Sequence, residues 1–396
     1  MPNTVQPTLS SRLSPELTFL IACCRAEPSQ DDADLIRSYL PHITDHRALL
    51  AASLRHGVLP LVYKAVKKLS DEGRVAAAEE LTEAFKTVYM QIAQRNMLMT
   101  AELLRLMKLL EKNGIDALAF KGPALAQLAY GDITLRQFGD LDILVGKTQA
   151  RRAISLLEAD GYVPEIQLSG SRKEAFFASV NVIGLSKPSH GIRIEVHWEL
   201  LSKNYAVFWD MGDLWSRPGH VTVGGSRVPV PSQTDHLLYL CIHGSKHVYE
   251  RLEWITDVDR TVRMSPPDWE RLLGEAEKKG VKRMVLLGLW LCRELLSLPL
   301  PEAILTRMDR DKTAGKLGRK IIAMQFGHAE TRGRSYGTFG LLWCMREKFS
   351  DRLRFTLYGL LLPKFDDFRY LALPRPLIFL YPVVRLFRLT TKYFKR

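Results

Sequence analysis

Cysteine is scarce in this sequence and is not arranged for metal binding. The chain has five cysteines in 396 residues, an odd number, and they lack the close Cys-x-x-Cys pairs of a zinc site. This usage is typical of proteins in a reducing compartment. The sequence therefore predicts a cytoplasmic protein.

Long apolar runs are missing as well. No stretch approaches the roughly 20 apolar residues that a membrane span requires, and residues 1–14 lack the charged-then-apolar pattern of a signal peptide. The glycine-rich segment 331–340 lacks the Gly-Lys-Ser/Thr ending of a P-loop, and no internal repeat has a fixed period. The composition is that of an ordinary globular protein, 46% apolar and 25% charged. The chain is long enough for two or three domains.

Positive charge is unevenly distributed. The chain carries a formal net charge of +13, and residues 346–396 contain 12 Lys/Arg and 4 Asp/Glu, a net charge of +8. A basic surface suits nucleic acid, an anionic membrane surface or an acidic partner, and composition does not rank them. The basic amphipathic segment 376–396 either docks on the helical domain or lies on an anionic membrane, which would make the protein a peripheral membrane protein.

Two carboxylates stand at alternate positions of an apolar run in residues 136–145 (RQFGDLDILV). Side chains two apart in a strand share a face, so Asp140 and Asp142 point the same way while Leu141 and Ile143 point to the core. Like charges held this close repel unless a cation lies between them. The segment is either an edge strand with a solvated acidic face or half of a cation site.

A second alternating segment, 191–199 (GIRIEVHWE), places Glu195 and His197 on its polar face. If this strand pairs beside the first, Glu195 becomes a third carboxylate on the same surface. His197 either assists that site or is a hydrogen-bonded histidine of the strand.

A third segment, 116–123 (DALAFKGP), is typical of a buried strand followed by a turn and a helix. Pro123 suits the first helical position. Free N–H groups at a helix start, with Lys121 and Gly122 in the turn, form a plausible phosphate cradle. Arg136 either neutralises a phosphate or pairs with an acid.

Together these segments resemble a bacterial branch of the nucleotidyltransferases within the DNA polymerase β superfamily. The resemblance covers about residues 95–260 and is carried by KGPALA at 121–126, YGD at 130–132, RQFGDLDILV at 136–145 and EVHW at 195–198. The superfamily pattern is a Gly-Gly or Gly-Ser turn, a helix, two aspartates separated by a hydrophobic residue, and a third carboxylate on a later strand. Two features depart from it: the turn has no Gly-Ser, and 18 positions separate Gly122 from Asp140, which is longer than the commonest spacing.

The resemblance implies an α+β fold, with a small mixed-sheet nucleotidyltransferase core between helical bundles. We expect an N-terminal helical region at 1–114, the core at 115–231, a helical domain closing the cleft at 232–345, and a basic helical tail at 346–396. In the core we expect strands at 116–121, 139–145, 162–168, 179–186 and 191–199, followed by a hairpin at 220–230.

The resemblance also implies a site. Asp140, Asp142 and Glu195 would bind Mg²⁺, or Mn²⁺ in its place, and carry the catalysis, while Lys121, Gly122 and Arg136 would bind the phosphates of an NTP. Lys246 lies on a predicted helix that starts near Ser232 and shares a face with His243 and His247. Because the family closes its nucleotide cleft with such a helix, Lys246 is the fourth predicted phosphate ligand.

Three functions follow from the resemblance. The first is Mg²⁺-dependent transfer of a nucleoside monophosphate from an NTP to a hydroxyl or similar acceptor on a small molecule, peptide, protein or sugar. The second is a toxin- or antitoxin-type nucleotidyltransferase acting on tRNA or on a protein. The third is a non-catalytic nucleotide-binding scaffold. The acceptor stays unidentified from sequence.

Overall fold

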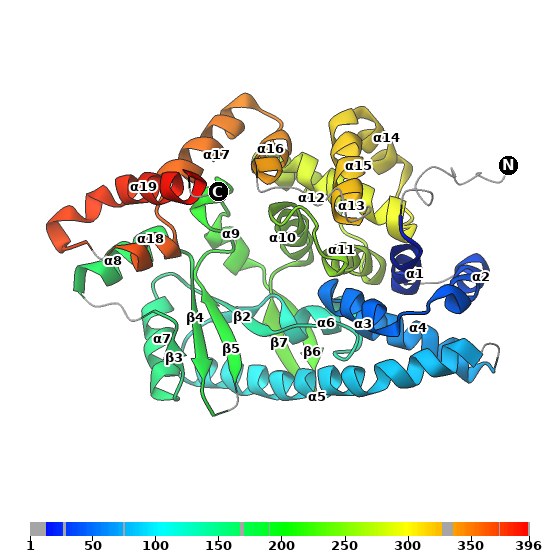
Figure 1. The fold of residues 1–396 in the computed structure, drawn as a ribbon. Helices are drawn as coiled ribbons and strands as arrows, with labels where there is room; N and C mark the ends of the chain where they lie inside the picture. The colour runs from blue at the N-terminus through cyan, green and yellow to red at the C-terminus, as the bar shows by residue number, and fades with distance from the viewer. Residues whose placement is uncertain are drawn as a thin grey trace.

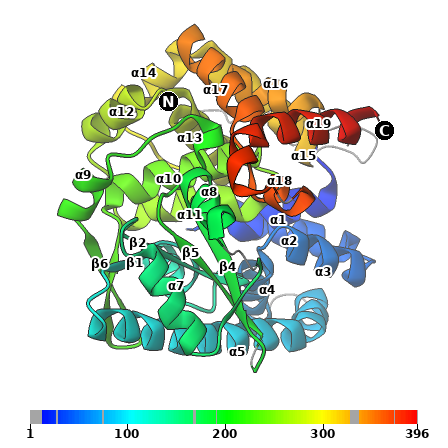
Figure 2. The same ribbon diagram turned by 90° about the vertical axis from the view of Figure 1, so that its left-hand side faces the viewer.

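The computed structural model describes residues 13–26, 29–73, 76–166, 170–189, 191–326, 336–371 and 373–394. Of the sequence segment 331–340, residues 331–335 fall outside them, and residues 336–340 belong to a helix. Figures 1 and 2 show a mixed sheet with helices around it and the long helix α5 running along one side of the molecule.

The N-terminal region is helical, as predicted. Ser14 caps the first helix by accepting a hydrogen bond from the Leu17 N–H, and Pro15 occupies the first helical position. The elements before the sheet are α1 Pro15–Cys24, α2 Gln30–Tyr39, the short 3₁₀ helix η2 Leu40–His42, α3 His46–Arg55, α4 Leu59–Asp71 and α5 Ala76–Lys112.

Five strands form the central sheet in the order β1-β2-β5-β4-β3. The pair β2·β5 is parallel and the other pairs are antiparallel, so the sheet is mixed and the predicted α+β fold class is confirmed. The strands are β1 Ala117–Ala119, β2 Asp140–Val145, β3 Val163–Pro164, β4 Val182–Lys187 and β5 Ile192–His197.

The two faces of β2 and β5 separate as the alternation predicts. Leu141 and Ile143 are fully buried in an apolar cluster together with Ile194 of β5 and Leu103 and Leu106 of α5. The opposite face carries the polar side chains of both strands. The apolar packing against α5 thus fixes which way the carboxylates point.

One stretch of the core differs from the sequence prediction. The strand expected at 162–168 is reduced to Val163–Pro164, and the strand expected at 179–186 begins only at Val182. Helix α8, Gly170–Ser179, lies between them. Its buried Phe176 packs on Trp198 and on Phe368 of the C-terminal segment, so a tertiary contact decides the structure of a short segment with weak periodicity. The other helices of the core are α6 Gly122–Tyr130 and α7 Ala150–Ala159.

The hairpin predicted at 220–230 is present as β6 Gly219–Val223 and β7 Ser226–Val230. Gly224 and Gly225 form its two-residue turn, with φ of +54° and +75°. Both residues need the left-handed region, which glycine adopts without steric cost.

Helices make up most of the rest of the chain. The helix predicted to start near Ser232 is α10, whose first turn is capped by the Ser232 hydroxyl. The remaining elements are η3 Lys203–Tyr205, α9 Met211–Ser216, α10 Gln233–Lys246, α11 Leu252–Met264, α12 Trp269–Lys278, α13 Lys282–Leu296, α14 Glu302–Arg310, α15 Lys312–Phe326, α16 Tyr336–Cys344, α17 Phe349–Leu361, α18 Phe365–Tyr370, η5 Arg375–Leu380 and α19 Tyr381–Phe394.

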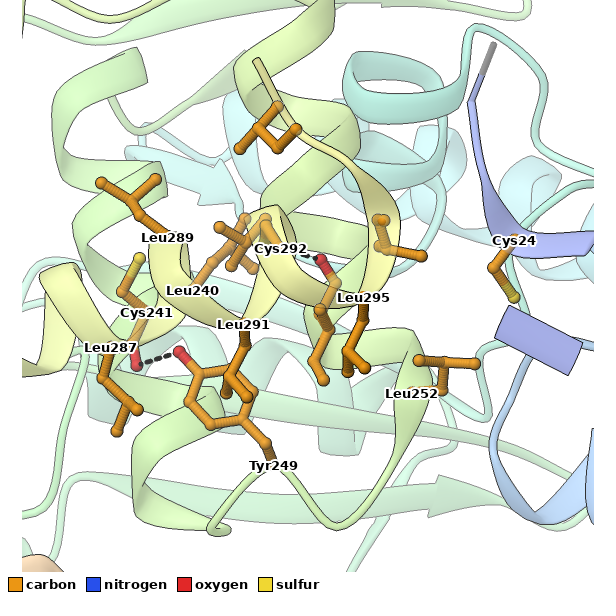
Figure 3. Packing of buried hydrophobic residues seen from close by; sticks show 14 of the residues in the cluster. Cys24, Leu240, Cys241, Tyr249, Leu252, Leu287, Leu289, Leu291, Cys292 and Leu295 are labelled. Carbon is orange, nitrogen blue, oxygen red and sulfur yellow. Dashed lines mark hydrogen bonds between the residues drawn. The ribbon is translucent and has the colours of Figure 1, made fainter. Parts of the chain in front are cut away.

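The N-terminal helices and the helices after the hairpin share one apolar core. It includes Phe19 of α1, Leu240 of α10 and Leu291 of α13. Figure 3 shows its centre, where the Tyr249 hydroxyl donates a hydrogen bond to the Cys241 carbonyl at 3.1 Å. Because this core spans residues from both 1–114 and 232–345, packing ties these regions together, and the division into four segments stays a prediction.

Within the described residues, no helix is both long enough and apolar enough to cross a membrane.

Candidate functional site

Strands β2 and β5 bring the predicted carboxylates together. In their parallel register Asp142 lies opposite Glu195, and Asp140 lies opposite Arg193. Adjacent strands are about 4.8 Å apart, so residues 53 positions apart in the chain become direct neighbours. One ligand atom from each of Asp142, Glu195 and His197 lies within 4.8 Å of the other two.

Asp142 is the centre of this cluster and is almost fully buried. Its Oδ1 accepts a hydrogen bond from Lys121 Nζ at 3.0 Å and lies 3.1 Å from His197 Nε2. His197 Nε2 also lies 3.2 Å from Glu195 Oε2, so the imidazole joins the two carboxylates. The other oxygen of Asp142, Oδ2, is buried and has no hydrogen-bond partner among the described residues.

Asp140 is more exposed and has a different partner. Arg193 donates from Nη1 to Asp140 Oδ2 at 3.1 Å, and the same nitrogen lies 2.7 Å from Glu195 Oε1. The Arg193 Nε–H is donated to Glu165 at 2.6 Å. Arg193 therefore contacts the cluster of carboxylates on its more exposed side, whereas Lys121 and His197 contact it on its buried side.

These neighbours shift the pKa values of the carboxylates in opposite directions. Burial alone would raise the pKa of Asp142 and of Glu195. For Asp142, the charges and hydrogen bonds of Lys121 and His197 outweigh the effect of burial. For Glu195, the hydrogen bond and charge of His197 outweigh it. The pKa of Asp142 falls below its usual range and that of Glu195 to about 2. Burial, followed by the charge of Asp142, raises the pKa of Asp140. Although burial opposes it, the hydrogen bonds to the two carboxylates raise the pKa of His197.

Gly122, the first residue of α6, lies close against β2. Gly122 has φ of +52°, and a Cβ at this position would lie 3.3 Å from the Asp140 carbonyl oxygen. The turn thus approaches β2 as closely as the backbone allows, which requires glycine. Lys121 is the N-cap residue; its ammonium has no acceptor with which to cap the helix, and it donates a hydrogen bond to Asp142 instead.

Arg136, a predicted phosphate ligand, is engaged by an acid in this structure. Its Nε and Nη2 donate to the two oxygens of Asp257 at 2.8 and 2.9 Å, and both side chains are buried. The Tyr130 hydroxyl donates to the same carboxylate at 2.8 Å. Arg136 therefore binds an acid, the other alternative that the sequence left open.

Lys246 lines the same cavity as the carboxylates. Its Nζ lies 5.2 Å from the centre of the Tyr205 ring, and no carboxylate of a described residue is within ion-pair distance. Burial, followed by repulsion from Lys121, lowers its pKa to about 8. An ammonium without a carboxylate partner is suited to an anionic ligand.

His243 of α10 and His247, which caps the end of this helix, do not form a metal site with the carboxylates. The only metal-type cluster among the described residues is Asp142, Glu195 and His197. Burial lowers the pKa of His243 well below its usual range and that of His247 to about 4, so both rings are neutral at pH 7. The His247 ring lies 4.8 Å from the Trp254 indole, and the two form an aromatic wall.

A cavity of about 730 Å³ joins these features. Its wall combines the carboxylate cluster, the Lys121 turn and the faces of α10 and α11. The lining includes Arg95, Asn96, Lys121, Gly122, Arg136, Asp140, Asp142, Asn181, Glu195, His197, Tyr239, His243, Lys246, His247, Arg251, Glu253 and Trp254. All seven residues predicted as site residues thus line one cavity, although Arg136 is engaged with Asp257.

Sequence reasoning gave too little weight to two residues. Arg193 was not among the predicted site residues, yet its side chain contacts both Asp140 and Glu195. Glu253 lies on α11 with a buried, unpartnered Oε2, and burial raises its pKa to about 7. The alternation of β5 does give the direction of the Arg193 side chain, whereas nothing in the sequence near Glu253 distinguishes it from a surface acid of a helix.

With this fold and site, the chain belongs to a family of uncharacterised nucleotidyltransferases, which matches residues 43–297. None of the curated proteins matches it. A crystal structure of an antigenic nucleotidyltransferase-like protein from Paracoccidioides brasiliensis is similar at 14% identity, covering 55% of this chain and 96% of that chain, with a TM-score of 0.29.

Proposed function

We propose that this chain transfers a nucleoside monophosphate from an NTP to a hydroxyl or similar acceptor on a small molecule, peptide, protein or sugar. The observation that carries the proposal is the register of β2 and β5, which places Asp142 opposite Glu195 and leaves Asp140 two residues away along β2. All three carboxylates line one cavity large enough for a nucleotide.

The donor set fits a divalent cation. Asp142 Oδ2 is a buried carboxylate oxygen without a hydrogen-bond partner in the described part of the chain, which is an uncompensated cost that a cation would remove. Carboxylate oxygens suit Mg²⁺, and the His197 nitrogen beside them widens the choice to Mn²⁺. Asp140, Asp142 and Glu195 would hold the metal, which when bound would neutralise phosphate charge and activate the acceptor hydroxyl.

The residues of the chain supply binding and orientation. The N–H groups at the start of α6 and the Lys121 turn would bind phosphate oxygens, since a helix N-terminus favours an anion. Lys246 faces the cavity without a carboxylate partner and would bind the rest of the triphosphate. The half-buried Trp254 offers an aromatic face for the base.

Glu195 has a narrower role than that of a general base. A carboxylate with a pKa of about 2 stays ionised at neutral pH and accepts a proton poorly. Its charge is instead available for a cation at all pH values near 7. We therefore assign Glu195 to metal binding, which its place opposite Asp142 in the cluster also supports.

A non-catalytic nucleotide-binding scaffold is the second candidate, and one observation favours it. Each carboxylate already has a cationic partner from the protein, namely Lys121 and His197 for Asp142 and Arg193 for Asp140 and Glu195. A scaffold would bind NTP through Lys121 and Lys246 with an affinity that does not depend on a divalent cation.

The test is incubation with each α-labelled NTP, Mg²⁺ or Mn²⁺ and a lysate of the host. We expect label to move from one NTP to one size class of acceptor, and Asp142→Asn or Glu195→Gln to abolish the transfer while the melting temperature stays within a few degrees. Glu199→Gln is the matched control, because Glu199 follows the same strand but pairs with Lys147 at 3.2 Å, outside the cluster. Full transfer by Asp142→Asn would overturn the assignment, and metal-independent NTP binding without transfer would favour the scaffold.

A further inference from the structure

Exposed apolar side chains are concentrated near the C-terminal end of the described chain. Of the 19 large hydrophobic residues that are exposed in the described part, 12 lie between residues 349 and 387. Figures 1 and 2 place α17, α18 and α19 together, far from α5. Scattered exposed hydrophobics are ordinary, but such a concentration marks an interaction surface.

On α17 these side chains form a stripe. Phe349, Leu353, Leu357 and Leu361 recur at intervals of four residues and are 70%, 49%, 45% and 43% exposed. This spacing places them on one face of the helix. Phe355 lies on the opposite side and is buried, so α17 is apolar both toward the core and toward solvent.

The neighbouring segment has the same two-sided character. Phe379 of η5 and Val383 and Phe387 of α19 are 71%, 58% and 59% exposed. Tyr381, in the first turn of α19, is buried in the apolar cluster that includes residues of the central sheet. The tail therefore packs on the rest of the protein through this cluster and through α17 and α18, and it still presents an apolar outer side.

Buried polar contacts hold this arrangement in place. The Arg385 Nε donates to the Gly359 carbonyl at 3.0 Å, which joins α19 to α17, and its Nη1 donates to the buried Asp367 at 3.1 Å. Arg388 also pairs with Asp367. These contacts fix the inner side of the segment. We define the C-terminal outer face as its exposed large apolar residues, namely Phe349, Leu353, Leu357, Leu360, Leu361, Tyr370, Leu371, Leu377, Phe379, Val383, Leu386 and Phe387.

The segment that carries the C-terminal outer face is basic in sequence, since residues 346–396 have a net charge of +8. The acid Asp367 is buried by its arginine partners, and Asp351 lies 3.9 Å from Arg354. Lys348 and Arg369 are exposed and have no acidic partner among the described residues.

We propose that the C-terminal outer face docks on an anionic lipid membrane surface. Exposed leucine, valine and phenylalanine side chains would enter the boundary between headgroups and acyl chains, while Lys348 and Arg369 meet anionic headgroups. Nucleic acid fits this surface less well, because eight of its twelve side chains are leucine or valine, which do not stack on bases and gain little beside phosphates, and only four are aromatic. An acidic protein would match the charge but offers no reason for so wide an apolar stripe. The inference does not depend on the proposed transferase activity.

The experiment is cosedimentation of the full chain with vesicles. Binding to phosphatidylserine–phosphatidylcholine vesicles is compared with binding to phosphatidylcholine alone, at about 0.1 M and about 0.5 M salt. We expect binding only to the anionic vesicles and weaker binding at high salt. Leu353→Gln with Leu357→Gln should lower the binding constant by roughly tenfold or more. Leu98→Gln with Met264→Gln removes side chains elsewhere that are even more exposed (61% and 58%), and should leave binding unchanged.

A second pair of variants tests the charge. Lys348→Gln with Arg369→Gln should lower binding to anionic vesicles by roughly tenfold, whereas Lys86→Gln with Lys278→Gln, on α5 and α12, should not. Melting curves show whether each variant is folded.

Three results would overturn the proposal. The first is failure to bind anionic vesicles at low salt, or equal binding by the wild type and the leucine pair. The second is concentration-dependent dimerisation that the leucine pair abolishes while vesicles stay unbound, which would assign the face to a second copy. The third is salt-sensitive binding of single-stranded RNA, lost in the Lys348/Arg369 pair, again without vesicle binding.

Discussion

Removal of the Asp257 charge is the change that we expect to damage the fold most severely near the cavity. Asp257 is 1% exposed and Arg136 is 7% exposed, and they form a two-pronged ion pair between the loop before β2 and helix α11. The Tyr130 hydroxyl adds a third hydrogen bond to the same carboxylate. Asp257→Asn keeps the shape of the side chain and leaves the Arg136 guanidinium buried without a counter-charge.

The magnitude follows from burial. Breaking a buried pair by removing one partner costs about 3–5 kcal/mol, because the remaining charge is desolvated and unpaired. We therefore expect Asp257→Asn and Arg136→Met each to lower the free energy of unfolding by about 3 kcal/mol. The double variant Arg136→Met with Asp257→Leu should recover more than half of this loss, since no charge is then left buried.

The assay is urea unfolding followed by tryptophan fluorescence, with the midpoint and slope giving the free energy of unfolding. Arg307→Gln is the control, because Arg307 and Glu270 form an ion pair whose side chains are 33% and 76% exposed, and such a pair contributes less than about 1 kcal/mol. A loss below about 1 kcal/mol for Asp257→Asn would refute the reasoning. Weaker NTP binding by Arg136→Met, with unchanged stability, would return Arg136 to the phosphate role that the sequence suggested.

Three further predictions concern the lining of the cavity. Burial raises the pKa of Glu253 from 4.5 to about 7. The folded state therefore holds this proton more tightly than the unfolded state, and the free energy of unfolding falls as pH rises between these values. Glu253→Gln should stabilise the protein by about 3 kcal/mol above pH 7 and not below pH 4.5, as measured by urea unfolding at several pH values. The Lys246 pKa of about 8 means that its positive charge is lost as pH rises through 8, so NTP affinity measured by calorimetry should fall there in the wild type but not in Lys246→Gln. Gly122→Ala should lower stability by about 1–2 kcal/mol in the same urea assay, because φ is +52° and the added Cβ would meet the Asp140 carbonyl; unchanged stability would contradict the strained turn.

The sequence was sufficient for the part of the fold that rests on local pattern. Alternation with a period of two identified β2 and β5 and the face on which Asp140, Asp142 and Glu195 lie. Glycine chemistry located the β6–β7 hairpin, and the Ser232 cap located the start of α10. These features depend on residues within one element, where steric and hydrogen-bonding rules act directly.

Features that depend on distant partners could not be derived in the same way. Arg136 meets Asp257 across 121 positions, and its sequence neighbourhood fits a phosphate ligand equally well. Helix α8 stands beside a shortened strand because Phe176 packs on Phe368 of the C-terminal segment. The exposure of the apolar stripe on α17 could not be predicted either, since periodicity shows that a face is apolar but not whether another element covers it.

The most direct test of the account is Mn²⁺ binding, measured by electron paramagnetic resonance with an NTP present. The wild type and Glu199→Gln should bind Mn²⁺ alike, whereas Asp142→Asn and Glu195→Gln should each lose roughly tenfold or more in affinity. Equal Mn²⁺ affinity in all four proteins would show that the paired carboxylates of β2 and β5 hold no metal.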